Sequence, residues 1–311
     1  MRLWAKLMTW MINNYHDPVL LKESLDGLDI QGDDVIVDVT FGGGGHSREI
    51  LNLLSNKGLL LAFDQDNEAL ENQWDDERLL IAPSNFRFLI NFVKFFDVFP
   101  VDGVLADLGV SSHQFDIPER GFSIRNSGDL DMRMNQDSSL TAARVVNQYQ
   151  EKDLYRIFNN YADIKNVKRL VKHLQSSRKN RKINTTGELV GVLETIAPGK
   201  RENQFYAQVF QAIRIEVNDE MGALRDMLHQ TAKAIRPGGR LVVISYHSIE
   251  DRMVKNFIRT GNVDGKEEKD IYGNNNAAFK AITKKPIIPT DEEIERNPRA
   301  RSAKMRVAEK L

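Results

Sequence analysis

Short apolar runs alternate with helical patterns along the first third of the chain. Four runs of β-branched and other apolar residues predict strands at 35–39, 59–63, 79–82 and 101–106. Residues 47–54, which follow the first run, show helical spacing instead. Strands that alternate with helices are typical of βαβ units, so the pattern predicts an α/β fold with a parallel sheet.

A long segment with helical patterns follows the fourth apolar run. The next clear strand covers 240–245, so residues 107–239 separate two strands that a βαβ connection joins within about 30 residues. Apolar residues recur at helical spacing within 154–164, 189–196 and 221–235. We therefore expect a helical domain inserted between the fourth and fifth strands.

These patterns define the expected domain organisation. Residues 11–114 and 216–311 form one discontinuous domain with the sheet, and residues 115–215 form the inserted helical domain, with a role in substrate recognition. Residues 303–308 predict one further strand, which closes the sheet as an antiparallel edge. Residues 1–10 form a separate extension.

A glycine-rich loop separates the first strand from the first helix. Residues 38–46 read Asp-Val-Thr-Phe-Gly-Gly-Gly-Gly-His, and a strand, a glycine loop and a helix in this order are typical of a nucleotide-type cofactor site. An ordinary tight turn with a helix cap is the alternative. A dinucleotide fingerprint needs a third glycine, where this chain has Ser47 or Arg48. Asp38 would repel a pyrophosphate and attract a cationic ligand, such as S-adenosylmethionine with its sulfonium and ammonium groups.

Acidic residues end three of the four predicted strands. Asp38 lies at the end of the first predicted strand, and Asp64 and Asp107 follow the second and fourth runs. Because ligands of open α/β sheets bind at the carboxyl ends of the strands, we expect all three at one crevice. Asp64 stands where an acidic residue usually holds a ribose diol. Each residue alone could be a simple helix cap, but three at successive strand ends favour a binding site.

Composition and charge narrow the function further. The 311 residues, 41% of them hydrophobic, suffice for one large core or for two domains. The chain has no cysteine, and its six histidines lack metal-ligand spacing, so we expect no metal site. With a net charge of −1, the chain as a whole does not attract nucleic acid, so any such affinity must come from local basic patches. The basic run Arg178-Lys179-Asn180-Arg181-Lys182 is one such patch, although a solvated loop explains it about as well.

The first ten residues contain no apolar segment of the kind found in signal peptides, and Met11 is a candidate for the natural start. No apolar stretch of the sequence is long enough to span a bilayer. We therefore expect a soluble protein of the cytoplasm.

Nine motifs in colinear order, from about Asn14 to Arg306, resemble the bacterial 16S ribosomal RNA cytosine-N4 methyltransferases, the MraW family. The matching segments are 15–21, 40–47, 63–66, 107–112 with Gln114, 120–123, 129–134, 210–217, 238–245 with 247–252, and 297–299 with 301–304. The departures are small: Gly43 stands where a basic residue is frequent, and Tyr246 replaces the usual phenylalanine. Residues 1–10 lie outside the resemblance.

The resemblance implies a class I S-adenosylmethionine-dependent methyltransferase, with a Rossmann-like sheet and an inserted helical domain. It implies methyl transfer to the N4 amine of a cytidine in the decoding region of 16S ribosomal RNA. The RNA partner would be held within the small ribosomal subunit, and a homodimer is a further possibility. The cofactor contacts implied by the motifs are Gly44, Gly45, His46, Asp64, Phe86, Asp107 and Gln114.

The chemistry of N4 methylation adds candidates for catalysis and RNA binding. The exocyclic amine is a weak nucleophile, so an acceptor must draw its proton as nitrogen attacks. Asp107 is the first candidate for this catalytic role, and Asp131 and His247 are weaker ones. Phe115, Phe122 and Tyr246 could stack on bases or belong to the core. The candidates for RNA phosphate contacts are Arg120, Arg133, Arg178, Lys179, Arg181, Lys182 and Arg214.

Two other classes of protein remain as alternatives. A nicotinamide-dependent enzyme would need the third glycine and would lack Asp38. A non-catalytic ribosome assembly factor could keep the fold without the chemistry, but the presence of Asp64 and Asp107 argues against this reading.

Overall fold

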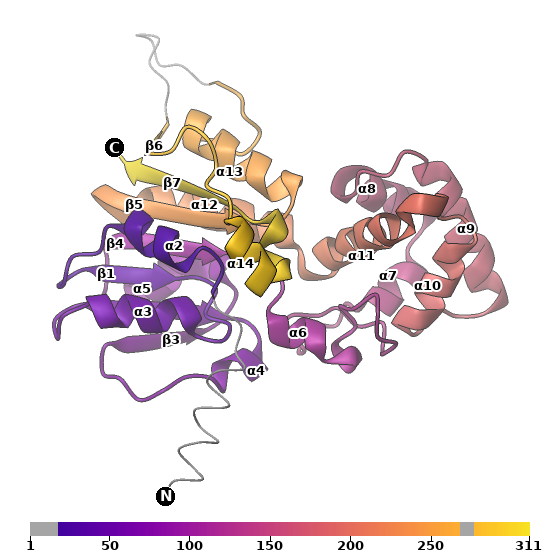
Figure 1. Ribbon diagram of the computed structural model, residues 1–311, viewed down its shortest axis with the longest axis horizontal. Coiled ribbons are helices and arrows are strands. Elements are labelled where there is room, and N and C mark those ends of the chain that lie inside the picture. The colour runs from indigo at the N-terminus through magenta and orange to yellow at the C-terminus, as the bar shows by residue number, and fades with distance from the viewer. Residues whose placement is uncertain (1–17, 268–276) are drawn as a thin grey trace, which may run out of the picture. The chain divides into compact units, whose positions relative to one another are not determined.

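The computed structural model describes residues 18–267 and 277–311, which form two compact units (Figure 1). The first unit combines the chain up to Gly109 with Gly222–Leu311, and the second is Val110–Met221. The sequence placed these boundaries at 115 and 215 instead. The expected extension at residues 1–10 and the start of the first family motif, 15–17, lie outside the described residues.

A seven-stranded sheet forms the centre of the first unit. Its strands are β1 (Val35–Asp38), β2 (Leu59–Asp64), β3 (Leu79–Pro83), β4 (Val101–Asp107), β5 (Ile235–Ser245), β6 (Phe279–Ala281) and β7 (Lys304–Lys310). Their order is β3-β2-β1-β4-β5-β7-β6. The first five strands in this order run parallel, which confirms the α/β prediction, and β7 pairs antiparallel with β5 and β6.

The prediction for the last strand was half right. Residues 303–308 were expected to form an antiparallel edge, and β7 is antiparallel as expected. The edge is β6, however, because Phe279–Ala281 pairs with the outer side of β7. A strand of three residues is too short an apolar run to be recognised from the sequence.

Alternating side chains of the strands enter two hydrophobic layers. Ile36, Leu60 and Leu105 pack with α2 (Leu21–Leu28) and α3 (Gly45–Leu53) on one face. Phe63 contacts Phe92 of α5 (Leu89–Phe95) on the other face, with ring centroids 5.4 Å apart. There α12 (Glu220–Ala234) is joined to α5 by the Gln230 side chain, which accepts from the Ile90 amide at 2.8 Å.

Three short or late helices complete the first unit. They are α4 (Asn67–Leu70), α13 (Ser248–Thr260) and α14 (Asp291–Arg296). Helices on both faces leave only the strand ends of the sheet open, and the strand order reverses between β1 and β4. The glycine loop follows β1, and Asp107 is the last residue of β4. The topology therefore places both at the point where the strand order reverses.

The second unit is helical, as expected for the insertion. Its helices are α6 (Ser112–Asp116), α7 (Ala142–Gln148), α8 (Glu151–Tyr161), α9 (Val167–Asn180), α10 (Thr186–Glu194) and α11 (Glu202–Asn218). Their apolar faces share one core, with Phe158, Leu174, Leu189 and Ile213 buried in it. The unit therefore has a core of its own, separate from that of the sheet.

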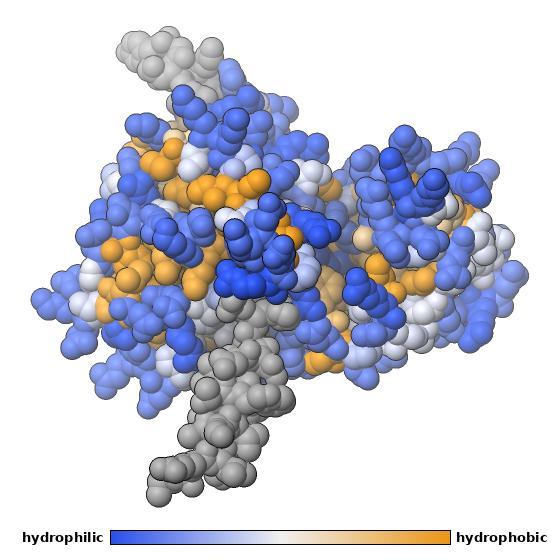
Figure 2. Space-filling view, viewed as in Figure 1, coloured by the Kyte–Doolittle hydropathy of each residue, from blue (hydrophilic) through white to orange (hydrophobic). Residues whose placement is uncertain are grey.

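On the face drawn in Figure 2, hydrophilic side chains predominate on both units and apolar residues form separate patches. Among the described residues, no helix combines the length and the apolar character needed to cross a membrane.

Candidate cofactor and catalytic site

The glycine loop is held in place by Asp38 at the end of β1. Its side chain is only 1% exposed and accepts hydrogen bonds from the Thr40 amide at 3.0 Å and from the Ser47 hydroxyl at 2.7 Å. Ser47 occupies the position of the third glycine of a dinucleotide fingerprint, and it is fully buried. Asp38 therefore holds the loop through these hydrogen bonds, and its side chain does not face the solvent. This corrects the expectation that Asp38 attracts a cationic ligand directly.

Two glycines in the loop adopt a left-handed conformation. Gly42 and Gly44 have φ angles of 53° and 74°, and a Cβ on Gly44 would come within 2.7 Å of the Trp74 ring. Gly45 has no positive φ, but a Cβ there would approach the Pro18 side chain to 2.4 Å. A side chain at Gly44 or Gly45 would therefore clash with the ring of Trp74 or with Pro18, and the loop favours glycine at these positions.

The register of the sheet places Asp64 and Asp107 on either side of the loop. Asp38 pairs with Ala62 of β2 and with Leu105 of β4, so both neighbouring strands continue two residues further. Those residues are Asp64 and Asp107. The expectation that the strand-end acids share one edge of the sheet is thereby confirmed.

Asp64 accepts two backbone hydrogen bonds. The Gly42 amide donates to Oδ2 at 2.8 Å, and the Asp66 amide donates to Oδ1 at 2.9 Å. Burial raises the pKa of Asp64 to about 6, and these two hydrogen bonds lower it again in part. Each carboxylate oxygen has a second lone pair, so Asp64 can still accept from a pair of ligand hydroxyls.

Asp107 is fixed from three directions. The Tyr246 hydroxyl donates to its Oδ1 at 2.7 Å, and its own amide donates to the Thr40 hydroxyl at 2.7 Å. His46 Nδ1 lies 4.0 Å from Oδ2. Burial raises the pKa of Asp107 to about 6, against the lowering effects of His46 and Tyr246. The Asp107 carboxylate is thus held in a fixed position. It is ionised at neutral pH, and its pKa lies close to neutral pH.

The sequence did not reveal Tyr246 as the partner of Asp107. It was considered as a base-stacking or core residue, but the two side chains meet across 139 positions of the chain. Burial raises the pKa of Tyr246 well above its ordinary value, so its hydroxyl remains protonated and donates. Thr40, which holds the Asp107 backbone, was likewise not singled out as a site residue.

His46 has a defined orientation. It is 6% exposed, and its Nε2 lies 3.1 Å from the Val19 carbonyl oxygen. A carbonyl can only accept, so Nε2 carries a proton and Nδ1 is the nitrogen that faces Asp107. This position, beside Asp107 in the first turn of α3, agrees with a place at the cofactor site.

The other two predicted cofactor residues occupy different surroundings. Phe86 is the first residue of a 3₁₀ turn directly after β3, at the same edge of the sheet as Asp64. Gln114 belongs to the second unit, where its side chain and that of Ser111 form the capping box of α6. A cofactor contact by either residue remains a prediction.

The two weaker candidates for proton acceptance are engaged elsewhere. Asp131 forms a bidentate ion pair with Arg133, at 2.8 and 2.7 Å. His247 caps α13, and its Nδ1 accepts from the Glu250 amide at 3.3 Å. The lone pair of that nitrogen is thus already in use, which leaves Asp107 as the strongest of the three.

Three arginines predicted to contact RNA have structural partners in the second unit. Arg120 is 5% exposed and donates to the carbonyl groups of Arg133 and Met134 at 3.0 and 3.2 Å. Arg133 is paired with Asp131, and Arg214 makes a bidentate pair with Glu220 at 2.7 and 2.8 Å. These contacts hold the helical unit together, and RNA contact by the three arginines remains a prediction.

The basic run at 178–182 is divided by the structure. Arg178 lies in α9 and donates to the carbonyl groups of Val146 and Tyr149, so it too has a structural role. Arg181 pairs with Glu188 at 2.6 Å, with 82% of its side chain exposed. Lys179 and Lys182 are exposed. RNA contact by the last three residues remains a prediction, and the helical state of 178–180 corrects the loop interpretation.

The aromatic candidates for base stacking are in the core. Phe122 is 5% exposed, and Phe115 packs edge-to-face against it with centroids 6.4 Å apart. Phe122 belongs to the apolar core of the second unit, and Phe115 is partly buried and packs against that core. The core interpretation, left open by the sequence, is therefore the right one for these two residues.

The donor and acceptor set at the sheet edge suits one class of cofactor. A pyrophosphate would meet Asp64 and Asp107 in place of the basic or amide groups that it needs, whereas a ribose diol and a cationic centre suit two carboxylates. The left-handed glycines allow the backbone to approach such a ligand closely. With its doubly wound sheet and antiparallel β7, the protein is a class I S-adenosylmethionine-dependent methyltransferase.

Comparison with known proteins identifies the family. The model of the MraW methylase family matches residues 13–311, and the chain belongs to this family. It is 54% identical over 297 residues to ribosomal RNA small subunit methyltransferase H of Flavobacterium johnsoniae, covering 96% of this chain and 98% of that protein. The protein of the same name from Parabacteroides distasonis is 54% identical over 298 residues, with coverage of 96% and 98%.

Solved structures show a more distant likeness. The crystal structure of an rRNA methylase from Streptococcus thermophilus is 13% identical and has a TM-score of 0.38. The match covers 93% of this chain and 95% of that chain.

Proposed function

We propose that this protein transfers the methyl group of S-adenosylmethionine to the N4 amine of a cytidine in the decoding region of 16S ribosomal RNA. Its relatives at 54% identity are named as small-subunit ribosomal RNA methyltransferases. The structural observation that carries the proposal is the Asp107 carboxylate at the end of β4, held by Tyr246 and near His46.

Asp107 has the properties that methylation of an exocyclic amine requires. The nitrogen lone pair of such an amine is delocalised into the ring, so the nitrogen reacts only as it gives up a proton. A hydrogen-bonded carboxylate with a pKa of about 6 is ionised at pH 7.5 and close enough to neutrality to take a proton. Because Tyr246 occupies Oδ1, the proton acceptor in this mechanism is Oδ2.

The other loop residues bind and orient the cofactor in this proposal. Asp64 accepts from the ribose hydroxyls, the backbone at Gly44 and Gly45 approaches the amino-acid end, and Phe86 packs against the base. When bound, S-adenosylmethionine supplies an electrophilic methyl group. His46 holds one side of the site through its bond to Val19 and keeps a polar nitrogen toward Asp107.

The proposal includes the cellular setting of the substrate. We take the cytidine to be methylated within the small ribosomal subunit, in the cytoplasm, with ribosomal RNA as the principal partner. Methylation rates on free 16S RNA and on purified small subunits, compared at equal concentration, test this part. A homodimer is a separate question that sedimentation of the full chain answers.

Two rival functions make different predictions. A nicotinamide enzyme would bind NAD, but Ser47 fills the third glycine position and hydrogen-bonds Asp38. Calorimetry with NAD and with S-adenosylmethionine distinguishes the two cofactors. An assembly factor without catalysis would bind the subunit and leave the RNA unmethylated.

The central test is mass spectrometry of ribosomal RNA from cells with and without this protein. We expect one cytidine of the decoding region to lose one methyl group when the protein is absent and to regain it when the protein is restored. A variant with Asp107→Asn serves as the control, since it should restore the protein without the modification. Identical RNA in all samples would contradict the proposal.

Tyr246→Phe is expected to move the pH dependence of methyl transfer. The hydrogen bond from Tyr246 stabilises the ionised form of Asp107, so its loss raises the pKa of Asp107 above the present value of about 6. The groups facing Asp107 that remain are His46, Asp38 and Glu250. In the variant, the rate of methyl transfer should therefore begin to fall at a higher pH than in the wild type. At pH 9 the two rates should differ little.

Single-turnover rates between pH 5 and pH 9 measure this shift. Phenylalanine keeps the ring and its packing, so the melting temperature should change little. An acid limb that stays in place would show that the Tyr246 hydroxyl does not govern the ionisation of Asp107.

A further inference from the structure

Helix α9 carries an unusual concentration of positive charge. Val167–Asn180 contains five lysines and arginines and no acidic residue, although the whole chain has a net charge of −1. Val167, Leu170, Val171 and Leu174 face the core of the second unit. The opposite face of the helix therefore presents a basic stripe to the solvent.

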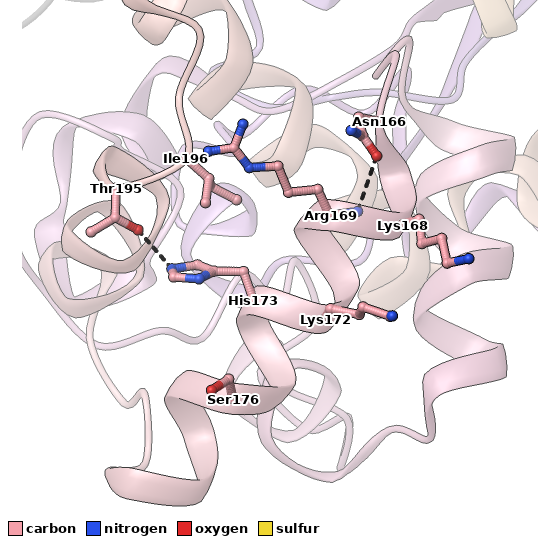
Figure 3. Close-up of a pocket in the computed structure, with 8 residues that line it drawn as sticks. All are labelled: Asn166, Lys168, Arg169, Lys172, His173, Ser176, Thr195 and Ile196. Carbon is pink, nitrogen blue, oxygen red and sulfur yellow. Dashed lines mark hydrogen bonds between the residues drawn. The ribbon is translucent and has the colours of Figure 1, made fainter.

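A surface groove of 670 Å³ runs along this stripe (Figure 3). Six of its eight lining residues come from α9 and its N-cap, and two follow α10. They are Asn166, Lys168, Arg169, Lys172, His173, Ser176, Thr195 and Ile196. In Figure 3 the Arg169 side chain extends toward Ile196, while the amines of Lys168 and Lys172 lie on the other side of α9.

One wall of the groove is fixed by hydrogen bonds. His173 Nε2 lies 3.0 Å from the Val192 carbonyl oxygen and 2.7 Å from the Thr195 hydroxyl, which join α9 to the end of α10 (Figure 3). Asn166 caps α9 by accepting from the Arg169 amide at 3.2 Å. The groove is thus built on packed helices and does not depend on a loop.

The three cations of the groove differ from several arginines of this unit that have acidic partners. Arg156, Arg181 and Arg214 are each paired with a carboxylate. Within the described part of the chain, no ion pair or side-chain hydrogen bond engages the charged groups of Lys168, Arg169 and Lys172, and all three are exposed. Glu194 is adjacent in sequence to the lining residue Thr195 and is not paired with them.

We infer that this groove binds the sugar–phosphate backbone of the substrate RNA, in addition to the contacts made at the base. The inference rests on the proposed function for the identity of the RNA. Lys168 and Lys172 are four residues apart on the helix, a rise of about 6 Å, so their charges follow a line along α9. Arg169 lies on the other side of this helix, so the three charges do not converge on one point. An extended polyanion fits such a line better than a single phosphate does.

The neutral groups of the groove support a nucleic acid over an acidic protein segment. Hydroxyl and amide side chains beside lysine and arginine are the usual set that contacts phosphate and sugar oxygens. Ser176, Thr195 and Asn166 supply these groups next to the three cations. The groove lacks an aromatic platform, so we expect it to add affinity and orientation without base specificity.

The test measures binding of the full-length protein to an RNA fragment that contains the decoding region, by fluorescence anisotropy at several salt concentrations. The variant is Lys168→Gln with Arg169→Gln and Lys172→Gln. Each contact to a single strand contributes roughly 0.7 to the slope of log affinity against log salt. We expect the slope to fall by about 2 and the affinity at 0.15 M salt to fall severalfold.

A matched control removes the same charge from the other unit. Lys22→Gln, Lys57→Gln and Lys94→Gln remove three positive charges from exposed side chains, as the groove variant does, so the net charge of the two variants is equal. This control should keep the wild-type slope. Circular dichroism and S-adenosylmethionine affinity confirm that both variants are folded.

The outcomes separate this inference from the proposed function. Equal loss in both variants, or an unchanged slope in the groove variant, would overturn the inference. So would normal binding to the RNA fragment with weakened binding to whole subunits, since the groove would then contact a ribosomal protein. A wild-type protein that binds the fragment through the groove but methylates no cytidine would contradict the proposed function and leave the inference standing.

Discussion

Asp107→Asn is expected to lower the rate of methyl transfer to cytidine N4 by about a hundredfold, within the range for loss of a positioned proton acceptor. Asparagine keeps the size of the side chain and one oxygen, which can still accept from Tyr246. It cannot take up a proton from the amine. The remaining rate would come from holding the two substrates in line.

The variant should remain folded, and the electrostatics indicate why. Burial raises the pKa of Asp107 from 3.8 to about 6, so the charged form is less favourable in the folded than in the unfolded protein. The folded state then binds more protons between pH 4 and pH 6, and this group's contribution to stability declines as the pH rises through that interval. Removing the charge should leave the melting temperature at pH 7.5 unchanged or higher.

Single-turnover rates with saturating cofactor and small subunits measure the effect on chemistry. Tyr246→Phe is the matched comparison, because it changes the same hydrogen bond and leaves the carboxylate. Near-normal rates for Asp107→Asn would exclude Asp107 as the acceptor. Asp131 would then come under test, after its ion pair with Arg133 is removed.

The sheet and its edge could be read from the sequence because their determinants are local. Apolar runs of four to six residues predicted the strands, and an acidic residue directly after a run lies at the carboxyl end of that strand. In a parallel sheet these ends meet at one edge. Asp64 and Asp107 were therefore predictable as neighbours of the glycine loop before any contact was known.

Helix α9 shows a signal that was present and was overlooked. Val167, Leu170, Val171 and Leu174 have the spacing of an amphipathic helix, but the basic run near its end suggested a loop. Arg178 belongs to the last turns of this helix, where it donates to backbone carbonyls. The charge pattern of 167–180, read as one helical face, points to the groove at Lys168 and Lys172.

Other parts of the site could not be predicted from sequence, because their partners are distant along the chain. A sequence motif looks the same whether its arginine contacts a phosphate or a backbone carbonyl. Only the fold shows that Arg120 is buried and donates to the carbonyl group of Met134. The bond between Tyr246 and Asp107 is equally nonlocal. Such assignments depend on tertiary packing, which periodicity does not encode.

Asp64→Ala is expected to weaken S-adenosylmethionine binding by at least about tenfold, or roughly 1.4 kcal/mol. The carboxylate is the natural acceptor for two ribose hydroxyls, and alanine leaves those hydroxyls without partners. The change also removes the acceptor for the amides of Gly42 and Asp66, so the glycine loop loses one of its anchors. Both effects lower affinity.

Asp64→Asn provides the graded control and a dependence on pH. It keeps one acceptor oxygen, so its affinity should lie between those of wild type and Asp64→Ala. In the wild type, burial places the pKa of Asp64 at about 6, and the ionised acceptor is lost as the pH falls through that value. The affinity for S-adenosylmethionine should therefore decrease below pH 6 in the wild type. It should decrease less in Asp64→Asn, because of the two carboxylates only Asp107 still titrates there. Calorimetry on folded variants that gave the same affinity and the same pH dependence as wild type would remove Asp64 from the cofactor site, and the ribose would then have to be held by another residue at the end of β2 or β3.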